Sequence, residues 1–314
     1  MNSSGIQPNI TKVSTLSVIN MEFIRMVVII PMCICFFFFL IFLGAMLTIF
    51  FTNSVAQETA RYILFVHMLI NDTVYLTLAL LLFVLYFYQV TLPFTFCYII
   101  VTLTSTSLKV TPYNLAVMSL ERYVAICFPL RHGEICTVRR TFLAIALVWT
   151  IGLIPNVIDF IVLSSSVQKS YFLLYIRCSR STFTITAMQE AIRIFAHALT
   201  FSLAGLTILF TYIRITILAL KIVTGKASVT KAAKTMMLHS IQLVLCMSSF
   251  GSTAVELLFK DNAALLPVIN FCFFMCLPRF LSLLIYGVRD ELFLGYIKRY
   301  LVCNASKMVP NSAT

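Results

Sequence analysis

Long apolar stretches alternate with short polar segments along the chain. A helix that crosses a bilayer needs about 20 predominantly apolar residues, because its backbone N–H and C=O groups find no water in the hydrocarbon core. Seven stretches meet this requirement, near residues 26–51, 62–88, 97–127, 139–162, 190–222, 231–259 and 264–288. The pattern predicts an all-α membrane protein, a single bundle of seven transmembrane helices.

The segment after the seventh stretch has a different helical pattern. Between Arg289 and Cys303 the apolar residues recur at helical spacing, while Lys298 and Arg299 fall at other positions. This predicts a short amphipathic helix along the membrane surface, with Cys303 either palmitoylated or a free thiol. The expected divisions are an N-terminal segment (1–25), the helical bundle (26–288) and an amphipathic helix with a tail (289–314).

Composition and charge agree with a membrane protein. The chain of 314 residues is 61% hydrophobic and only 11% charged, whereas soluble domains contain about 25% charged residues. Its net charge of +12 could attract nucleic acid, but in membrane proteins Lys and Arg concentrate in cytoplasmic loops. With the N-terminus outside, about twice as many Lys and Arg residues fall on the cytoplasmic side as outside. We expect a multi-pass plasma-membrane protein in a lipid bilayer, with an extracellular N-terminus and no nucleic-acid partner.

The remaining local motifs say more about targeting than about chemistry. Asn2 and Asn9 open two glycosylation sequons in the N-terminal segment, where they would face the outside. That segment lacks the layout of a cleaved signal peptide, so the first apolar stretch is expected to direct membrane insertion. The Cys and His spacings do not form a metal motif, and no HExxH or GxSxG motif occurs. We expect no metal, no cofactor and no enzymatic activity.

The third stretch ends in an unusual charged motif, MSLERYVAICFPLRH, from Met118 to His132. Glu121 and Arg122 are adjacent there, at the cytoplasmic end of the predicted helix. Charges near lipid are costly unless they are paired or hydrated. The two side chains could pair in a resting state and separate on a rearrangement, or they could merely mark the membrane boundary. The motif alone leaves both interpretations open.

Several motifs together resemble those of odorant receptors within the rhodopsin-like G-protein-coupled receptors. The resemblance rests on ERYVAICFPLRH, on TYIRI in the fifth helix, on KAAKTMMLHS opening the sixth and on PRFLSLLIYGVRDELF in the seventh, with Trp149 in the fourth. The stretches ARYILFVHMLIND and ICTVRRT look most like fish and amphibian members. The resemblance implies a receptor that binds an extracellular small-molecule odorant and activates a heterotrimeric G protein. A transporter or channel is the alternative, but the inverted repeats or broken helices typical of transporters are not found.

The resemblance also implies which residues carry these roles. It implies a disulfide bond between Cys97, at the outer start of the third helix, and Cys178 in the second extracellular loop. The switch and the G-protein surface would include Glu121, Arg122, Tyr123, Tyr212 and Tyr286. The outer halves of the third, fifth and sixth helices would line the ligand pocket with Thr104, Ser105, Leu108, Lys109, His197, Thr200, Phe250, Gly251 and Ala254.

Four polar residues within the predicted spans carry open questions. Lys109 could be the counter-ion of an acidic odorant or could face an internal polar network, and His197 could be a ligand contact or a packed core residue. Asp72 and Arg279 reach similar depths on the second and seventh helices, ~16 Å and ~15 Å from the inner face. In the resembling superfamily an acid at the position of Asp72 commonly holds a sodium ion. We predict that Arg279 replaces this cation and pairs with Asp72; otherwise Arg279 points elsewhere.

Overall fold

The structure is a computed structural model that describes residues 29–30, 32–34, 36–221, 237, 240–241, 243–245 and 276–281. Several predictions therefore lie outside the described residues. These are the glycosylation sites Asn2 and Asn9, the amphipathic helix with Cys303, and the site residues Phe250, Gly251, Ala254 and Tyr286.

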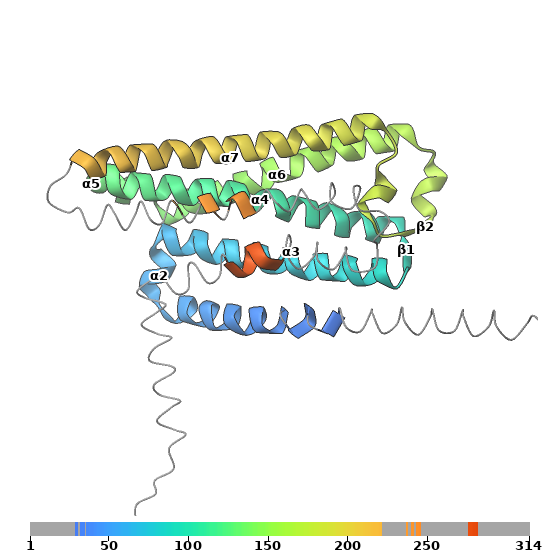
Figure 1. Ribbon diagram of the computed structural model, residues 1–314, viewed down its shortest axis with the longest axis horizontal. Coiled ribbons are helices and arrows are strands. Elements are labelled where there is room, and N and C mark those ends of the chain that lie inside the picture. The colour runs from blue at the N-terminus through green and yellow to red at the C-terminus, as the bar shows by residue number, and fades with distance from the viewer. Residues whose placement is uncertain are drawn as a thin grey trace, which may run out of the picture.

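Five helices in the described residues are long and apolar enough to cross a membrane. They are the first helix (Met32–Thr52), α3 (Ala60–Phe87), α4 (Phe94–Cys127), α6 (Val138–Ser166) and α7 (Ala187–Lys221), which run beside one another in Figure 1. They match the first five predicted spans. The structure extends α4 and α7 at their starts and α6 at its end, because helices project past the apolar window that hydropathy detects.

Short elements connect the long helices at the two ends of the bundle. Helices α2 (Ser54–Glu58) and α5 (Pro129–Ile135) lie at one end, and strands β1 (Thr91–Pro93) and β2 (Tyr175–Arg177) lie at the other (Figure 1). The strands pair antiparallel, with Leu92 opposite Ile176. Pro129 begins α5, where the missing N–H of proline costs nothing. The apolar pattern did not predict these short elements, because none is long enough to show a period.

The loop between α6 and α7 is fastened over the β1–β2 end of α4. Cys97 and Cys178 form the disulfide bond that the resemblance implied, with their Cα atoms 5.3 Å apart. Two 3₁₀ turns, Lys169–Leu173 and Arg180–Phe183, flank β2. The ring of Phe94 lies 4.9 Å from that of Phe172 and 5.4 Å from that of Phe183, centroid to centroid. Aromatic packing and the covalent bond together hold this loop against the start of α4.

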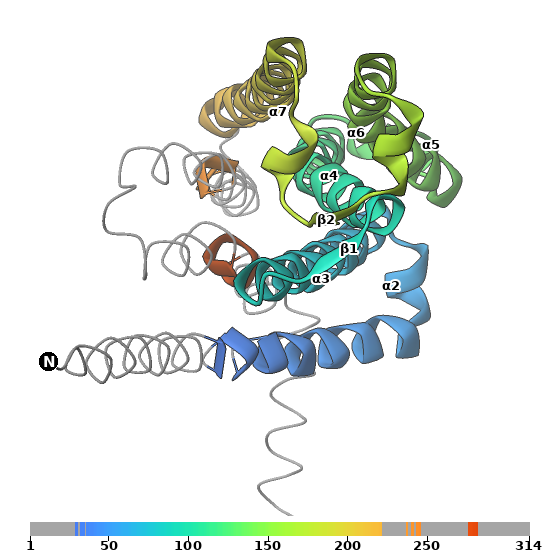
Figure 2. The same cartoon turned by 90° about the vertical axis from the view of Figure 1, so that its right-hand side faces the viewer.

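Helix α4 lies among α3, α6 and α7, as the view along the bundle shows (Figure 2). Its contact with α6 is close at Gly152, where an added Cβ atom would lie 3.4 Å from Val110 Cγ2 and 3.6 Å from Thr106 Cγ2. Small residues allow such an approach between membrane helices, whose association depends on close packing rather than on escape from water.

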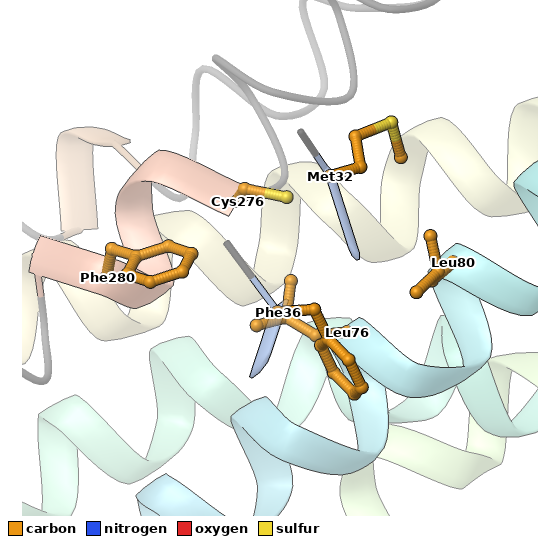
Figure 3. Close-up of a pocket in the computed structure, with 6 residues that line it drawn as sticks. All are labelled: Met32, Phe36, Leu76, Leu80, Cys276 and Phe280. Atoms are coloured by element: carbon orange, nitrogen blue, oxygen red, sulfur yellow. The ribbon is translucent and has the colours of Figure 1, made fainter. Parts of the chain in front are cut away.

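The described part of the seventh span packs against the first helix and α3. Cys276 and Phe280 line a small apolar pocket together with Met32 and Phe36 of the first helix and Leu76 and Leu80 of α3 (Figure 3). The rings of Phe39 and Phe280 meet edge to face, with centroids 5.4 Å apart. Segments far apart in the sequence thus share one core.

We expect Gly152→Leu to separate α4 from α6 and to lower stability by about 1–3 kcal/mol, because an overpacked interface must shift its backbones. Gly152→Ala should be tolerated, since its Cβ makes only ordinary van der Waals contact. Thermal unfolding of the purified protein in detergent measures both effects. Gly44→Leu is the matched control, because nothing lies within 4 Å of a Cβ at Gly44. Equal losses for the two leucine variants would show that close packing at Gly152 is not special.

Candidate functional site: buried polar clusters of the bundle

Helix α4 carries the largest share of the buried polar side chains in the described part of the chain. It contributes Thr106, Ser107, Lys109, Thr111, Asn114, Ser119 and Glu121. Burying a polar group costs free energy unless the group finds a hydrogen-bond partner. In the clusters described below, side chains of neighbouring helices supply such partners.

The first cluster joins α3 to the seventh span through an ion pair. The Nε atom of Arg279 lies 3.5 Å from Oδ1 of Asp72, and each side chain is 1% exposed. The guanidinium also lies over the ring of Tyr75, 4.5 Å from its centroid, in a cation–π contact. Thr111 donates a hydrogen bond of 3.2 Å to the same carboxylate oxygen. The structure thus brings together the two charges that depth along the helices placed at one level.

A hydrogen-bond relay extends this cluster between α3 and α4. Asn71 Nδ2 donates to Thr111 Oγ1 at 3.0 Å and to the Ser107 carbonyl at 3.1 Å. Thr111 therefore accepts from Asn71 while donating to Asp72. The relay fixes α4 beside the ion pair, so three helices meet at this level.

Lys109 belongs to a second cluster, between α4 and α6. Its ammonium donates to Ser105 Oγ at 3.1 Å and to Asn156 Oδ1 at 3.0 Å, and the residue is 2% exposed. Asn156 in turn donates to Thr106 Oγ1 at 2.7 Å. This is the internal polar network that the sequence left as one of two possibilities. A role for Lys109 as the counter-ion of a ligand stays a prediction.

A third cluster links α3, α4 and α6 through Trp149. Its indole Nε1–H donates to His67 Nε2 at 2.9 Å, so Nε2 must be unprotonated and the ring proton must sit on Nδ1. That Nδ1 lies 3.2 Å from Asn114 Oδ1, and Asn114 Nδ2 donates to the Leu64 carbonyl at 3.1 Å. Sequence reasoning missed His67 and Asn114. The available signal was Trp149 itself, since a buried indole N–H usually finds an acceptor.

The predicted ligand residues on α4 and α7 separate into two groups. Ser105 and Lys109 take part in the α6 network, whereas Leu108 is buried in the main core with Phe201 and Ala204 of α7. Thr200 is 2% exposed and its Oγ1 lies 3.1 Å from the Tyr113 hydroxyl. Thr104 and His197 are only half-buried. The structure therefore does not bring the predicted ligand residues of α4 and α7 together on one side of a pocket.

Near the β1–β2 end, a further ion pair ties α6 to α7. Arg193 Nη2 lies 2.7 Å from Asp159 Oδ2, with the side chains 16% and 9% exposed. Arg193 also hydrogen-bonds Thr184 in the segment that precedes α7. Sequence reasoning missed this pair, because a charge near a helix end reads as an interfacial residue. The pair holds the loop at a second point besides the disulfide bond.

At the α5 end, Glu121 is a buried carboxylate with two basic neighbours. Its Oε1 lies 3.1 Å from His132 Nε2 of α5, and its Oε2 lies 3.9 Å from Arg122 Nε. The predicted contact between Glu121 and Arg122 is therefore present but long. The contact of Glu121 with His132 was not predicted. Burial raises the pKa of the Cys136 thiol and the Glu121 carboxylate raises it further, against the effect of Arg140. Cys136 therefore stays a neutral thiol beside Glu121.

Two aromatic contacts complete this end of the bundle. The Tyr123 ring lies 5.8 Å from that of Phe128 and 5.7 Å from that of Phe210 on α7, centroid to centroid. Tyr123 also packs against the buried Ile215 of α7. Tyr212, the other predicted switch residue on α7, is 37% exposed. The junction between α4 and α7 thus involves Tyr123 directly.

These features define a class of protein: a membrane receptor with a central third helix, a disulfide-fastened loop at one end and a Glu-Arg-Tyr motif at the other. The chain matches the family described as 7 transmembrane receptor (rhodopsin family) over residues 43–284, and it belongs to that family. The match extends the bundle over the two spans that the structure describes only in part, so the predicted seven-helix fold is confirmed. Over 265 residues the chain is 29% identical to "Odorant receptor 131-2" of Danio rerio, covering 83% of this chain and 81% of that protein.

We expect the Asp72–Arg279 pair to behave as one unit. Asp72→Asn or Arg279→Met alone should lose about 3–5 kcal/mol of stability, because each leaves a buried charge unpaired, and the double variant should recover much of it. The measurement is a double-mutant cycle on thermal unfolding and on surface expression.

The control for that cycle combines Asp72→Asn with Arg193→Met, since Arg193 pairs with Asp159 instead. These two changes should add. Additive losses for Asp72→Asn and Arg279→Met as well would mean that the two side chains do not stabilise each other.

Proposed function

We propose that this chain is an odorant receptor, which binds a small extracellular molecule within the helix bundle and activates a heterotrimeric G protein. Membership of the rhodopsin family of receptors and the similarity to a protein named as an odorant receptor support this proposal. The chain makes and breaks no bond in this scheme.

The observation that carries the proposal is the Glu121-Arg122-Tyr123 cluster. It lies at the end of the central helix, beside a loop helix on one side and α7 on the other. Arg122 is 21% exposed, and its Nε atom lies 3.9 Å from the Glu121 carboxylate, so this contact is a long one. This arrangement of Glu121 and Arg122 favours a role as a conformational switch over a pair that only marks the membrane boundary. The exposed Leu130 and Arg131 on α5 lie beside it and supply contact surface for a partner.

Two observations support the orientation of the proposed receptor. A disulfide bond persists in an oxidising compartment, which favours an extracellular position for the Cys97–Cys178 end. The opposite end exposes Arg131, Arg139 and Arg140, as expected of a cytoplasmic face. The N-terminus would then be extracellular and the protein would reside in the plasma membrane.

The proposed ligand site lies between the outer halves of α4, α7 and the sixth span. Thr104, Leu108, His197 and Thr200 are the candidates among the described residues, and the sixth span would add Phe250, Gly251 and Ala254. The Tyr113–Thr200 hydrogen bond joins α4 to α7, so a ligand that displaces it would alter how these helices pack. By population shift, a ligand that binds the active arrangement more tightly would open the inner end.

The position beside Asp72 also bears on regulation. Arg279 lies where, in the resembling receptors, a sodium ion neutralises the acid. A guanidinium held by an ion pair and by Tyr75 supplies that charge permanently. The proposed receptor therefore needs no bound cation at this level.

A transporter or channel stays the alternative function, and uptake or current without a G protein would favour it.

We expect Arg122→Ala to abolish odorant-evoked G-protein activation while leaving the number of receptors at the surface nearly unchanged. Glu121 keeps His132 as a partner, so the variant does not leave the buried carboxylate unpaired. Nucleotide exchange on the G protein, measured in membranes with odorant pools, reports the effect. Lys169→Ala, on the opposite end, is the control. An undiminished response of Arg122→Ala would remove Arg122 from the switch.

We expect Lys109→Met to lower stability by about 1–3 kcal/mol, because it removes the two hydrogen bonds that the ammonium donates and leaves only the Ser105–Asn156 bond between these side chains. The potencies of acidic and of neutral odorants on this variant should change by the same factor. Dose–response curves with acids, amines and neutral odorants kept separate provide the measurement. A selective loss of carboxylate odorants would instead identify Lys109 as a ligand counter-ion.

A further inference from the structure

The Glu121 carboxylate is contacted by bases from two different elements. Arg122 belongs to the same helix as Glu121, whereas His132 belongs to α5. The contact with His132 is shorter, 3.1 Å against 3.9 Å. Glu121 is 8% exposed, so water can do little for its charge and these two contacts count strongly.

The chemistry of the contact identifies the donor. An ionised carboxylate only accepts hydrogen bonds, so His132 must carry a proton on Nε2, either as the neutral Nε2–H tautomer or as the imidazolium. In both forms the N–H bonds to Oε1 and partly compensates the charge of the carboxylate, so the attraction that Arg122 meets at Oε2 is weaker. Arg122 and His132 therefore contact different oxygen atoms of the same carboxylate.

Helix α5 is held in place by contacts besides His132. Arg140 of α6 donates a hydrogen bond of 2.8 Å to the Glu134 carbonyl at the end of α5. At its beginning, Phe128 packs edge to face against Tyr123. His132 thus stays beside Glu121 whether or not Arg122 remains there.

We propose that His132 is a positioning residue that promotes activation by competing with Arg122 for Glu121. When Arg122 leaves, a buried carboxylate without another partner would oppose the change, because an unpaired buried charge is strongly unfavourable. His132 removes that penalty by remaining bonded to Oε1. It therefore sets the resting balance between inactive and active receptor, and it acts through Glu121 rather than by touching the ligand.

The sign of this effect distinguishes it from a restraint. If His132 simply clamped α5 in a resting position, its removal would raise signalling. As a competitor, its removal leaves Arg122 as the main basic partner of Glu121, strengthens the resting pair and lowers signalling. This inference rests on the proposed G-protein coupling, since signalling is the quantity that His132 would set.

The test compares ligand-independent nucleotide exchange on the G protein, per receptor at the surface, in membranes of cells that express the full chain. His132→Phe keeps the ring volume and removes the N–H donor; His132→Ala provides a second variant in case the larger ring disturbs folding. Either should lower basal exchange by about tenfold or more, the size expected for losing a hydrogen bond to a charged group. His132→Gln, which keeps an N–H donor, should restore most of it.

Glu121→Gln supplies the epistasis control. It should raise basal exchange, and adding His132→Phe to it should change nothing further, because no carboxylate remains to compete for. Arg131→Ala, on the same helix, is the control: its effect on basal exchange should be equal in the chain with Glu121 and in the Glu121→Gln variant.

The outcomes separate the two proposals. Higher basal exchange in His132→Phe, or an equal loss with and without Glu121, overturns the competition while leaving G-protein coupling intact. If the unaltered chain activates no G protein at all, with or without odorant pools, the proposed function itself fails and the role of His132 in signalling fails with it.

Discussion

Polar side chains buried in a membrane bundle must find their partners on neighbouring helices, and the rest of this structure depends on that constraint. The Asp72–Arg279 ion pair is its strictest case, because both side chains are almost wholly buried. Breaking such a pair leaves a charge in a medium that cannot solvate it. The pair therefore fixes how the seventh span meets α3, and the apolar contacts of Phe280 with the first helix follow from that placement.

The same constraint makes α4 the axis of the molecule. At successive levels it is tied to α3 through Asn71 and Thr111, to α6 through Asn156, and to α7 through Thr200. Its β1–β2 end is bonded covalently through Cys97. A helix tied to three described neighbours and anchored at one end can rearrange most easily at the other. The loosest described ionic contact of the motif, between Glu121 and Arg122, lies at that other end.

Hydropathy predicted the spans well because lipid thickness sets their length, and charges at matching depth were enough to place Asp72 and Arg279 together. The resemblance, rather than the spacing, supplied the disulfide bond. The contacts His67–Trp149, Asp159–Arg193 and Glu121–His132 were not predicted. Each depends on how a helix is rotated about its own axis. In a membrane helix the lipid-facing and core-facing sides are both apolar, so the pattern contains little information about that rotation.

The ligand site shows the same limit in a different way. The resemblance, together with depth along the helix, grouped Ser105, Leu108 and Lys109 in one pocket. The structure turns Ser105 and Lys109 toward α6 and Leu108 toward the core shared with α7. Residues at one depth on a helix point to different neighbours. Depth therefore predicts how far along the helix a residue lies, but not which neighbouring helix its side chain faces. A small molecule in the proposed pocket would meet α4 and α7 through Leu108 and Thr200. The Lys109 network would lie behind it and keep α4 fixed against α6. A change in α7 packing would then reach Tyr123, where α7 contacts the α5 end of α4.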